Sequence, residues 1–139
     1  MPLLIPADHM RVRAREAFFE HGQIPTGLID DAIVDSWRRC SAASKNVSEQ
    51  VEFDTVTRVG LLELLDSNRI LLDAATQPLE QLGQTVNGAG YSVLLTDENG
   101  IALAARRSEQ CAHTLISGAF RQGVNLSETN IGTSAMSCA

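Results

Sequence analysis

Three polar residues in the last part of the sequence could contribute to a ligand site: Glu128, Thr133 and Ser134. If a helix begins beside them, its free backbone N–H groups form a ready anion site, and the Thr and Ser hydroxyls add donors. The same residue types also cap helices, with Thr129 or Asn130 as the N-cap and Thr133 and Ser134 in the first turn. We favour capping as the interpretation and keep ligand binding as the alternative.

Catalytic motifs are absent from the sequence. It contains no G-x-S-x-G, H-E-x-x-H, P-loop or C-x-x-C pattern. Neighbouring carboxylates occur at residues 30–31 and 97–98, where a helix start and a turn explain them without catalysis. We therefore expect a protein that is not an enzyme and has no cofactor.

Cysteine and histidine do not form a metal-binding pattern. The three Cys are at positions 40, 111 and 138, and the three His are at positions 9, 21 and 113. Cys111 and His113 are close in sequence, but no second pair accompanies them, so we interpret them as surface residues rather than metal ligands. An odd number of scattered Cys is typical of reduced thiols in a cytoplasm.

Length and composition restrict the class of protein further. The chain has 139 residues, 44% of them hydrophobic, and a formal net charge of -6. These values predict about one domain and argue against a nucleic-acid-binding surface over the whole chain. No apolar run approaches the ~20 residues of a membrane-spanning helix, and the apolar start lacks the basic flank of a signal peptide. We expect a cytoplasmic protein without a membrane partner or direct nucleic-acid contact.

Two helices are predicted in an N-terminal helical segment, residues 1–56. The first extends from Asp8, as its N-cap, to about Glu20, and Gly22 stops it. The second begins near Asp30 and carries Trp37 as a core anchor. Its apolar face consists of Ile29, Ile33, Trp37 and Cys40.

A basic run lies inside the first predicted helix. Arg11 and Arg15 are one turn apart on that helix, whereas Arg13 points to its other side. We interpret the run as a solvated surface rather than a nucleic-acid-binding stripe.

A long connecting helix is predicted within residues 57–90. Apolar residues recur there by steps of four and three, which is the seam of a heptad repeat with one polar member, and Pro78 should bend or split the helix near Gln77. The helix either packs within its own domain or also pairs with a second copy of the chain, with Asn68 setting the register. The candidate dimer interface is Leu61, Leu65, Asn68 and Leu72, and the seam continues through Ala75, Leu79, Leu82 and Val86.

The hydrophobic period changes after residue 90. Residues 91–96 and 101–105 favour strands, and Asp97-Glu98-Asn99-Gly100 is a turn signal, so a β-hairpin is predicted. After the hairpin we expect a short helix within residues 110–119, a loop or strand at 120–126, and a loop that leads into a helix at 131–136. A lone hairpin is only marginally stable, and the last predicted helix has no stop signal. We therefore expect a piece of a larger protein, whose sheet is completed elsewhere or covered by a helix or a second copy.

Four separated motifs, in one order, resemble a bacterial regulator family. They are Gly27-Leu28-Ile29 with Ser36-Trp37-Arg38-Arg39-Cys40, the segment 68–79, Leu94-Leu95-Thr96-Asp97-x-x-Gly100, and the segment 123–135 with its Leu126-Ser127-Glu128-x-x-Ile131-Gly132-Thr133 core. Together they are similar to the N-terminal sensory region of acetoin-catabolism-type regulators, which activate sigma-54-dependent transcription.

The resemblance implies an α+β fold, with a mainly helical N-terminal half followed by a truncated GAF-like antiparallel sheet. Residues 91–139 are then a partial GAF-like domain, and Tyr91, Glu128, Thr133 and Ser134 are its candidate ligand-binding residues. The family's ATPase and helix-turn-helix do not occur within these residues. The effectors that the resemblance implies are small alcohols, ketones or related metabolites.

Two functions follow as hypotheses. The first is a ligand-sensing regulatory domain that passes effector binding to an ATPase by population shift. The alternative is a homodimerisation and scaffolding module without a ligand.

Overall fold

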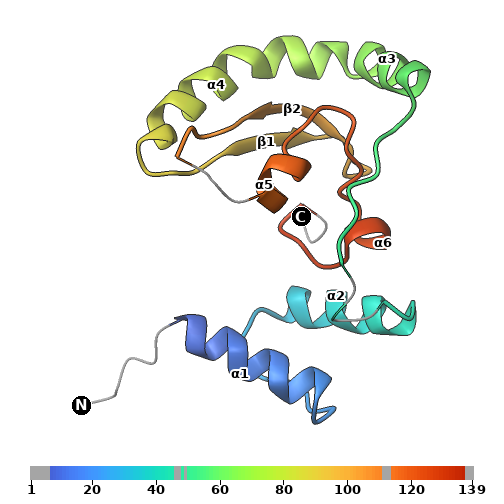
Figure 1. The fold of residues 1–139 in the computed structure, drawn as a ribbon, viewed down its shortest axis with the longest axis vertical. Coiled ribbons are helices and arrows are strands. Elements are labelled where there is room, and N and C mark those ends of the chain that lie inside the picture. The colour runs from blue at the N-terminus through green and yellow to red at the C-terminus, as the bar shows by residue number, and fades with distance from the viewer. Residues whose placement is uncertain (1–6, 46–47, 49, 111–113, 137–139) are drawn as a thin grey trace. The chain divides into compact units, whose positions relative to one another are not determined.

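Two compact units make up the chain, one spanning Met1–Gln50 and the other Val51–Ser137. The computed structural model describes residues 7–45, 48, 50–110 and 114–136 (Figure 1). These residues form helices and one two-stranded antiparallel sheet, in agreement with the predicted α+β class. No helix in the described part of the chain is both long enough and apolar enough to cross a membrane.

Unit 1 contains helices α1 (Ala7–Phe19) and α2 (Asp31–Ala42). The predicted start of α2 is confirmed, because the Asp30 carboxylate caps it by accepting a hydrogen bond of 2.8 Å from a backbone N–H in the first turn. Asp8, the predicted cap of α1, instead lies within its first turn. The C-terminal stop of α1 is followed by Gly22 at φ +63°, a conformation that favours glycine.

Aromatic packing joins the two helices of unit 1. The ring centroid of Trp37 on α2 lies 5.4 Å from that of Phe18 and 5.2 Å from that of Phe19, both on α1. Offset aromatic contacts of this length add to the burial of apolar area. Trp37 is therefore an anchor between the helices, as its place on the apolar face of α2 predicts.

The predicted long helix of unit 2 is two helices, α3 (Arg58–Ser67) and α4 (Arg69–Asn87). The break lies at Asn68 and not near Gln77, and Pro78 is inside α4. The Asn68 Nδ2 group donates a hydrogen bond of 2.9 Å to the backbone carbonyl of Leu64, and Asn side chains compete for helix carbonyls in this way. At Pro78 the helix loses only one backbone hydrogen bond and continues.

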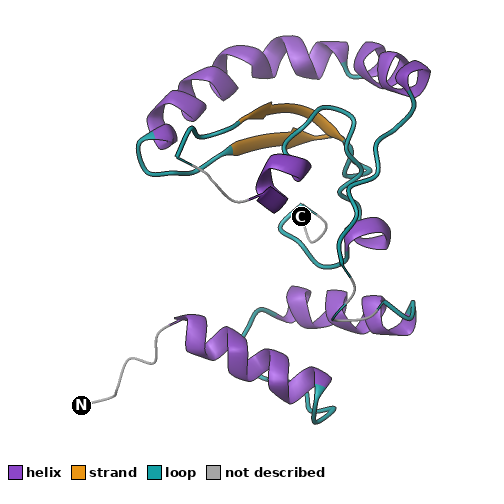
Figure 2. Cartoon of the chain, in the orientation of Figure 1, coloured by secondary structure: helices purple, strands orange, loops and turns teal. Residues whose placement is uncertain are grey.

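The predicted hairpin is present as β1 (Val93–Thr96) and β2 (Ala102–Arg106) (Figure 2). In its turn the Asp97 carboxylate accepts hydrogen bonds from the backbone N–H groups of Asn99 and Ile101. The register shifts between Leu95 and Thr96, because these residues pair with Ala104 and Ala102. One extra residue on β2 makes this a β-bulge, which increases the local twist.

Helices cover both faces of the hairpin. Helix α4 lies along one face and contacts both strands, and α5 (Thr114–Ala119) lies on the other side (Figure 1). The approach of α4 to β2 is close at Gly83, where an added Cβ atom would lie 2.9 Å from the Cβ of Arg106. The α5 side holds the core cluster, whose fully or nearly buried members are Ala102, Ala119, Val124 and Leu126.

One edge of the hairpin is paired by the chain itself. The backbone of residues 123–126 bonds to the start of β2, with the Ala102 N–H donating to the Val124 carbonyl at 2.9 Å and the Gly123 N–H donating to the Ala102 carbonyl at 2.7 Å. On its other side this segment bonds to residues 54–56. The predicted open rim is therefore covered at this end of β2.

The segments after the hairpin differ from their predicted outlines. The helix expected within 110–119 is α5, which begins at Thr114. The prediction of a helix at residues 131–136 is wrong. The helical turn in this region is α6 (Glu128–Ile131), which ends where the predicted helix would begin. Gly132, at φ +81°, ends α6 in a conformation that glycine adopts without strain.

Candidate functional site

Tyr91 lies in the connection between α4 and β1. Its side chain is 69% exposed, and its backbone N–H donates to the Val86 carbonyl at 3.3 Å. Behind it, the Ser108 hydroxyl donates to the Asn87 carbonyl at 3.1 Å, and the Ser108 N–H donates to the Ser92 hydroxyl at 2.9 Å. These bonds fasten the end of β2 to the end of α4, so the connection that carries Tyr91 is held at both ends.

Glu128 begins the single turn α6, and Thr133 and Ser134 follow it in the chain. All three are partly buried. The Gly132 N–H donates to the Glu128 carbonyl at 2.9 Å, which closes the turn. The three candidates are thus neighbours along the chain, and their convergence on one ligand stays a prediction.

The predicted cap of this turn is wrong. Ser127 is the N-cap, whereas Thr129 and Asn130 lie within α6 and Thr133 and Ser134 follow it. The Asn130 side chain instead donates to the Asn125 carbonyl at 2.8 Å. A helix of four residues has almost no macrodipole, so α6 offers little attraction for an anion.

Tyr91 does not join the other three candidates. It precedes β1 at one end of the hairpin, whereas the turn at the other end packs against Ser127, where an added Cβ on Gly100 would lie 3.1 Å from the Ser127 nitrogen. Four residues of extended strand separate the two ends by about 13 Å. The assignment of Tyr91 as a ligand contact stays a prediction.

The core cluster joins the start of β2 to α5 through Ala102 and Ala119. An added Cβ on Gly118 would lie 2.8 Å from the ring of Phe53, so α5 also packs closely on the segment that precedes α3. Five partly buried hydrophobic residues surround the core cluster: Phe53, Leu94, Phe120, Ile131 and Met136.

The candidate dimer interface lies on the half-buried side of α3 and α4. Leu61, Leu65, Asn68 and Leu72 are all half-buried within the chain, and an added Cβ on Gly123 would lie 3.4 Å from Leu61. The heptad seam thus packs, at least in part, inside unit 2. Its role between copies stays a prediction.

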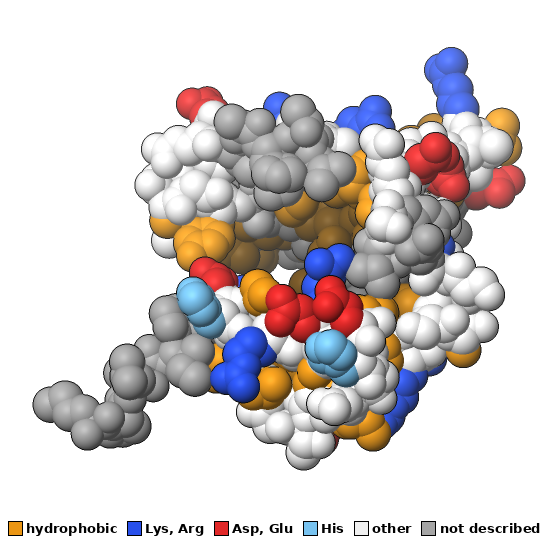
Figure 3. Space-filling model, turned by 60° about the horizontal axis from the view of Figure 1, so that its bottom comes forward, with side chains coloured by type: hydrophobic (Ala, Val, Ile, Leu, Met, Phe, Trp, Pro, Cys, Tyr) orange, Lys and Arg blue, Asp and Glu red, His pale blue; other side chains and the backbone are white. Residues whose placement is uncertain are grey.

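A second apolar surface on α3 and α4 is exposed. Ile70 is 87% exposed and Val59 is 66% exposed. The space-filling view of Figure 3 brings the bottom of Figure 1 forward, away from α3 and α4, and shows hydrophobic side chains scattered among charged ones. We call the following exposed residues outside the seam the apolar flank: Val59, Leu62, Ile70 and Leu71.

The electrostatic link between α4 and the sheet is an ion pair. The Arg106 Nε donates to the Glu80 carboxylate at 2.6 Å. This hydrogen bond, the positive charge of Arg106 and a hydrogen bond from Gln84 lower the pKa of Glu80 below its ordinary value of 4.5. The pair is about half exposed, so it orients α4 on β2 more than it stabilises the unit.

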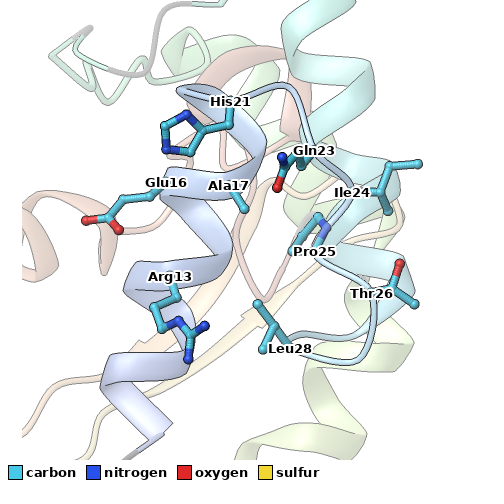
Figure 4. Close-up of a pocket in the computed structure, with 9 residues that line it drawn as sticks. All are labelled: Arg13, Glu16, Ala17, His21, Gln23, Ile24, Pro25, Thr26 and Leu28. Atoms are coloured by element: carbon cyan, nitrogen blue, oxygen red, sulfur yellow. The ribbon is translucent and has the colours of Figure 1, made fainter.

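Unit 1 has two surface hollows that sequence reasoning missed. One, of about 330 Å³, is lined by Arg13, Glu16 and His21 on the α1 side and by Pro25 and Leu28 on the loop (Figure 4). Figure 4 shows the Glu16 carboxylate directed away from the loop residues. The polar groups that line this hollow therefore do not converge on one point.

The other hollow, of about 450 Å³, lies between α1 and the start of α2 and is mostly apolar. We call it the α1–α2 groove. The sequence carries a partial signal for it, because Ile29, Ile33 and Trp37 share one predicted helix face and all three line the groove.

Metal ligands do not cluster in the described part of the chain, which contains no group of three or more His, Cys, Asp or Glu residues able to hold an ion. Cys111, His113 and Cys138 lie outside the described residues. Cys40 is half-buried on α2.

Comparison with known proteins adds no relative to this description. No family model, no curated protein and no solved structure matches the chain.

Proposed function

We propose that this chain is the ligand-sensing region of a sigma-54-dependent transcription activator, and that effector binding to it regulates an ATPase of the same regulator. The observation that carries the proposal is the layering of unit 2, in which α4 crosses one face of the hairpin and α5 packs on the other. This layering is compatible with the GAF-like fold that the sequence resemblance implies. Such a regulator acts in the cytoplasm and contacts DNA through another domain.

The proposed effector site is the core between the hairpin and α5, beside α6. Phe53 and Phe120 are partly buried against the core cluster, so a change of their rotamers opens space for a small alcohol or ketone. Glu128 precedes Ile131, which packs against the core cluster, and Thr133 and Ser134 follow it. These three residues supply the hydrogen-bonding groups of the site. A compact apolar site with a few polar groups is the usual form of a small-molecule pocket.

Helix α4 is the proposed route of transmission. It contacts both strands, and the Glu80–Arg106 ion pair and the Ser108–Asn87 hydrogen bond link it to the sheet. An effector that prefers one arrangement of the hairpin therefore also biases the position of α4. A shift of this kind requires only that the effector bind the two arrangements with different affinity.

Thermal unfolding with a panel of small alcohols and ketones, from ethanol and acetone to acetoin, tests sensing. At least one compound should raise the Tm of the chain in proportion to the logarithm of its concentration. Thr133→Val should reduce that shift, and Thr129→Val, at an exposed position of α6, is the matched control. If no compound raises the Tm, or if both variants reduce the shift equally, the proposed site is wrong.

A homodimerisation module is the second candidate, and the exposed apolar flank favours it. Large apolar side chains that stay exposed on two successive helices are candidates for a protein–protein contact. Sedimentation equilibrium should then detect a dimer that Ile70→Lys dissociates without loss of folding, whereas Gln77→Lys, at an exposed polar position of the same helix, leaves it intact. Leu65→Lys and Leu72→Lys should also lower folding stability, because these side chains are half-buried. A chain that is monomeric at every concentration contradicts this candidate.

A further inference from the structure

The α1–α2 groove has the form of a small-molecule site in the unit that the sensing proposal does not use. Its volume of about 450 Å³ is within the range of ligand pockets. The apolar lining consists of Met10, Val12, Leu28, Ile29, Ile33 and Trp37.

One wall of the groove is held in place before any ligand binds. The Trp37 ring packs against Phe18 and Phe19 with centroid separations of 5.4 and 5.2 Å. A fixed aromatic wall loses little conformational entropy when a ligand packs on it. The groove is therefore suited to an apolar ligand body, aromatic or branched.

Charge on the groove comes mainly from two guanidinium groups. Arg11 and Arg15 both line it from α1. Arg11 is paired only loosely, with Asp8 at 3.5 Å and both side chains largely exposed, and within the described residues Arg15 has no acidic partner at ion-pair distance. Asp30, the acidic residue of the lining, already accepts a hydrogen bond from the start of α2.

We propose that the α1–α2 groove binds an amphiphilic carboxylate, with its apolar body against Trp37 and Ile33 and its carboxylate at Arg15 and Arg11. Guanidinium groups recognise carboxylates through paired hydrogen bonds. Because both Arg side chains are exposed, most of the affinity comes from burial of the apolar body, and the charge gives a modest preference that salt screens.

The test uses the emission of Trp37, which is the only tryptophan in the chain. The full chain is titrated with 4-phenylbutyrate and, separately, with 4-phenylbutanol, which has the same body without the charge. We expect saturable changes with both, and about two- to five-fold tighter binding of the carboxylate, with the difference lost at 1 M salt.

Two matched variants locate the charge. Arg15→Gln should remove the preference for the carboxylate, whereas Arg13→Gln, on the same helix but lining the other hollow, should leave it unchanged. The proposal is overturned if neither compound gives a saturable change, if both bind equally at low salt, or if the two variants behave alike. It is also overturned if Trp37 emission depends on protein concentration and the compounds then fail to bind, because a second copy would occupy the groove. None of these results bears on whether alcohols or ketones stabilise unit 2.

Discussion

Glycine at position 83 is the residue that lets α4 approach the sheet. Any larger side chain there meets Arg106 on β2, because an added Cβ would lie 2.9 Å from the Arg106 Cβ. Real Cβ atoms do not approach that closely, so α4 or β2 would have to move. The contact that positions α4 therefore depends on the absence of one side chain.

Gly83→Ala should destabilise the chain, although alanine is the better helix former by about 0.8–1.0 kcal/mol. The steric conflict with Arg106 outweighs that gain, because overpacking commonly costs about 1–3 kcal/mol. Urea unfolding measures the difference. Gly88→Ala is the control, since nothing lies within 4 Å of a Cβ added there. A Gly83→Ala chain that is as stable as the Gly88→Ala chain contradicts the close approach.

Glu80→Gln should remove a stabilising contribution that depends on pH. The pKa of Glu80 is lowered by Arg106, so the contribution is present above the ordinary Glu pKa and is lost as pH falls through the lowered one. The variant should thus be less stable than the wild type at pH 7, and the gap should close in acid. Urea unfolding at pH 7 and pH 3 measures it, with Glu63→Gln on α3 as the charge-matched control. A gap at pH 7 no larger than that of the control contradicts the role of the ion pair.

Sequence reasoning succeeds for residues whose roles are local. The start of α2 near Asp30 and the placement of Trp37 on its apolar face are confirmed, because both can be read from residue types within one or two helical turns of the sequence. The cap at residues 129–130 was wrong because Ser127 and Gly132 set the limits of α6. Either end of such a polar stretch is a plausible helix start. The earlier start is favoured by two hydrogen bonds that Asn125 accepts, one from the Ser127 N–H and one from the Asn130 side chain.

Among the elements, α3 and α4 show where a periodic pattern is informative and where it is ambiguous. The heptad steps predict helix throughout, and Thr57 begins α3 as expected by accepting a hydrogen bond from Gly60. The pattern does not say whether the seam faces the same chain or another copy. In the structure, Leu61 and Leu72 are half-buried within unit 2, whereas Ile70 is exposed. Burial against a sheet and pairing between helices call for the same apolar spacing.

Pro78→Ala should stabilise α4, since the helix continues through this position. The substitution restores a backbone N–H for the preceding turn and removes the ring, and proline costs about 3 kcal/mol in a helix interior. We expect a gain of about 1–3 kcal/mol in the free energy of unfolding by urea. Gln77→Ala, at an exposed neighbouring position, should change the free energy of unfolding by about 0.5 kcal/mol at most. A loss of stability in Pro78→Ala would mean that the sheet requires a bend here.

At the scale of the whole molecule, the long-range backbone pairing is what the sequence conceals. The hairpin and its turn are evident from local residues, but the bonds from residues 123–126 to β2 and to residues 54–56 join segments far apart in the chain. Backbone bonds of this kind leave no side-chain pattern.

The division into units gives the sensing proposal a spatial test. The proposed effector site belongs to unit 2, between the hairpin and α5, and the carboxylate groove belongs to unit 1. An effector that binds the native state protects the amides of the unit that holds it, because local opening must then release the ligand.

Amide hydrogen exchange of the full chain, mapped with and without each alcohol and ketone of the panel, tests the central claim most directly. The account predicts that one compound slows exchange in β1, β2 and α4 together, while exchange in α1 and α2 is unchanged. A panel in which no compound slows exchange in the hairpin, or one whose protection is confined to α1 and α2, would contradict it.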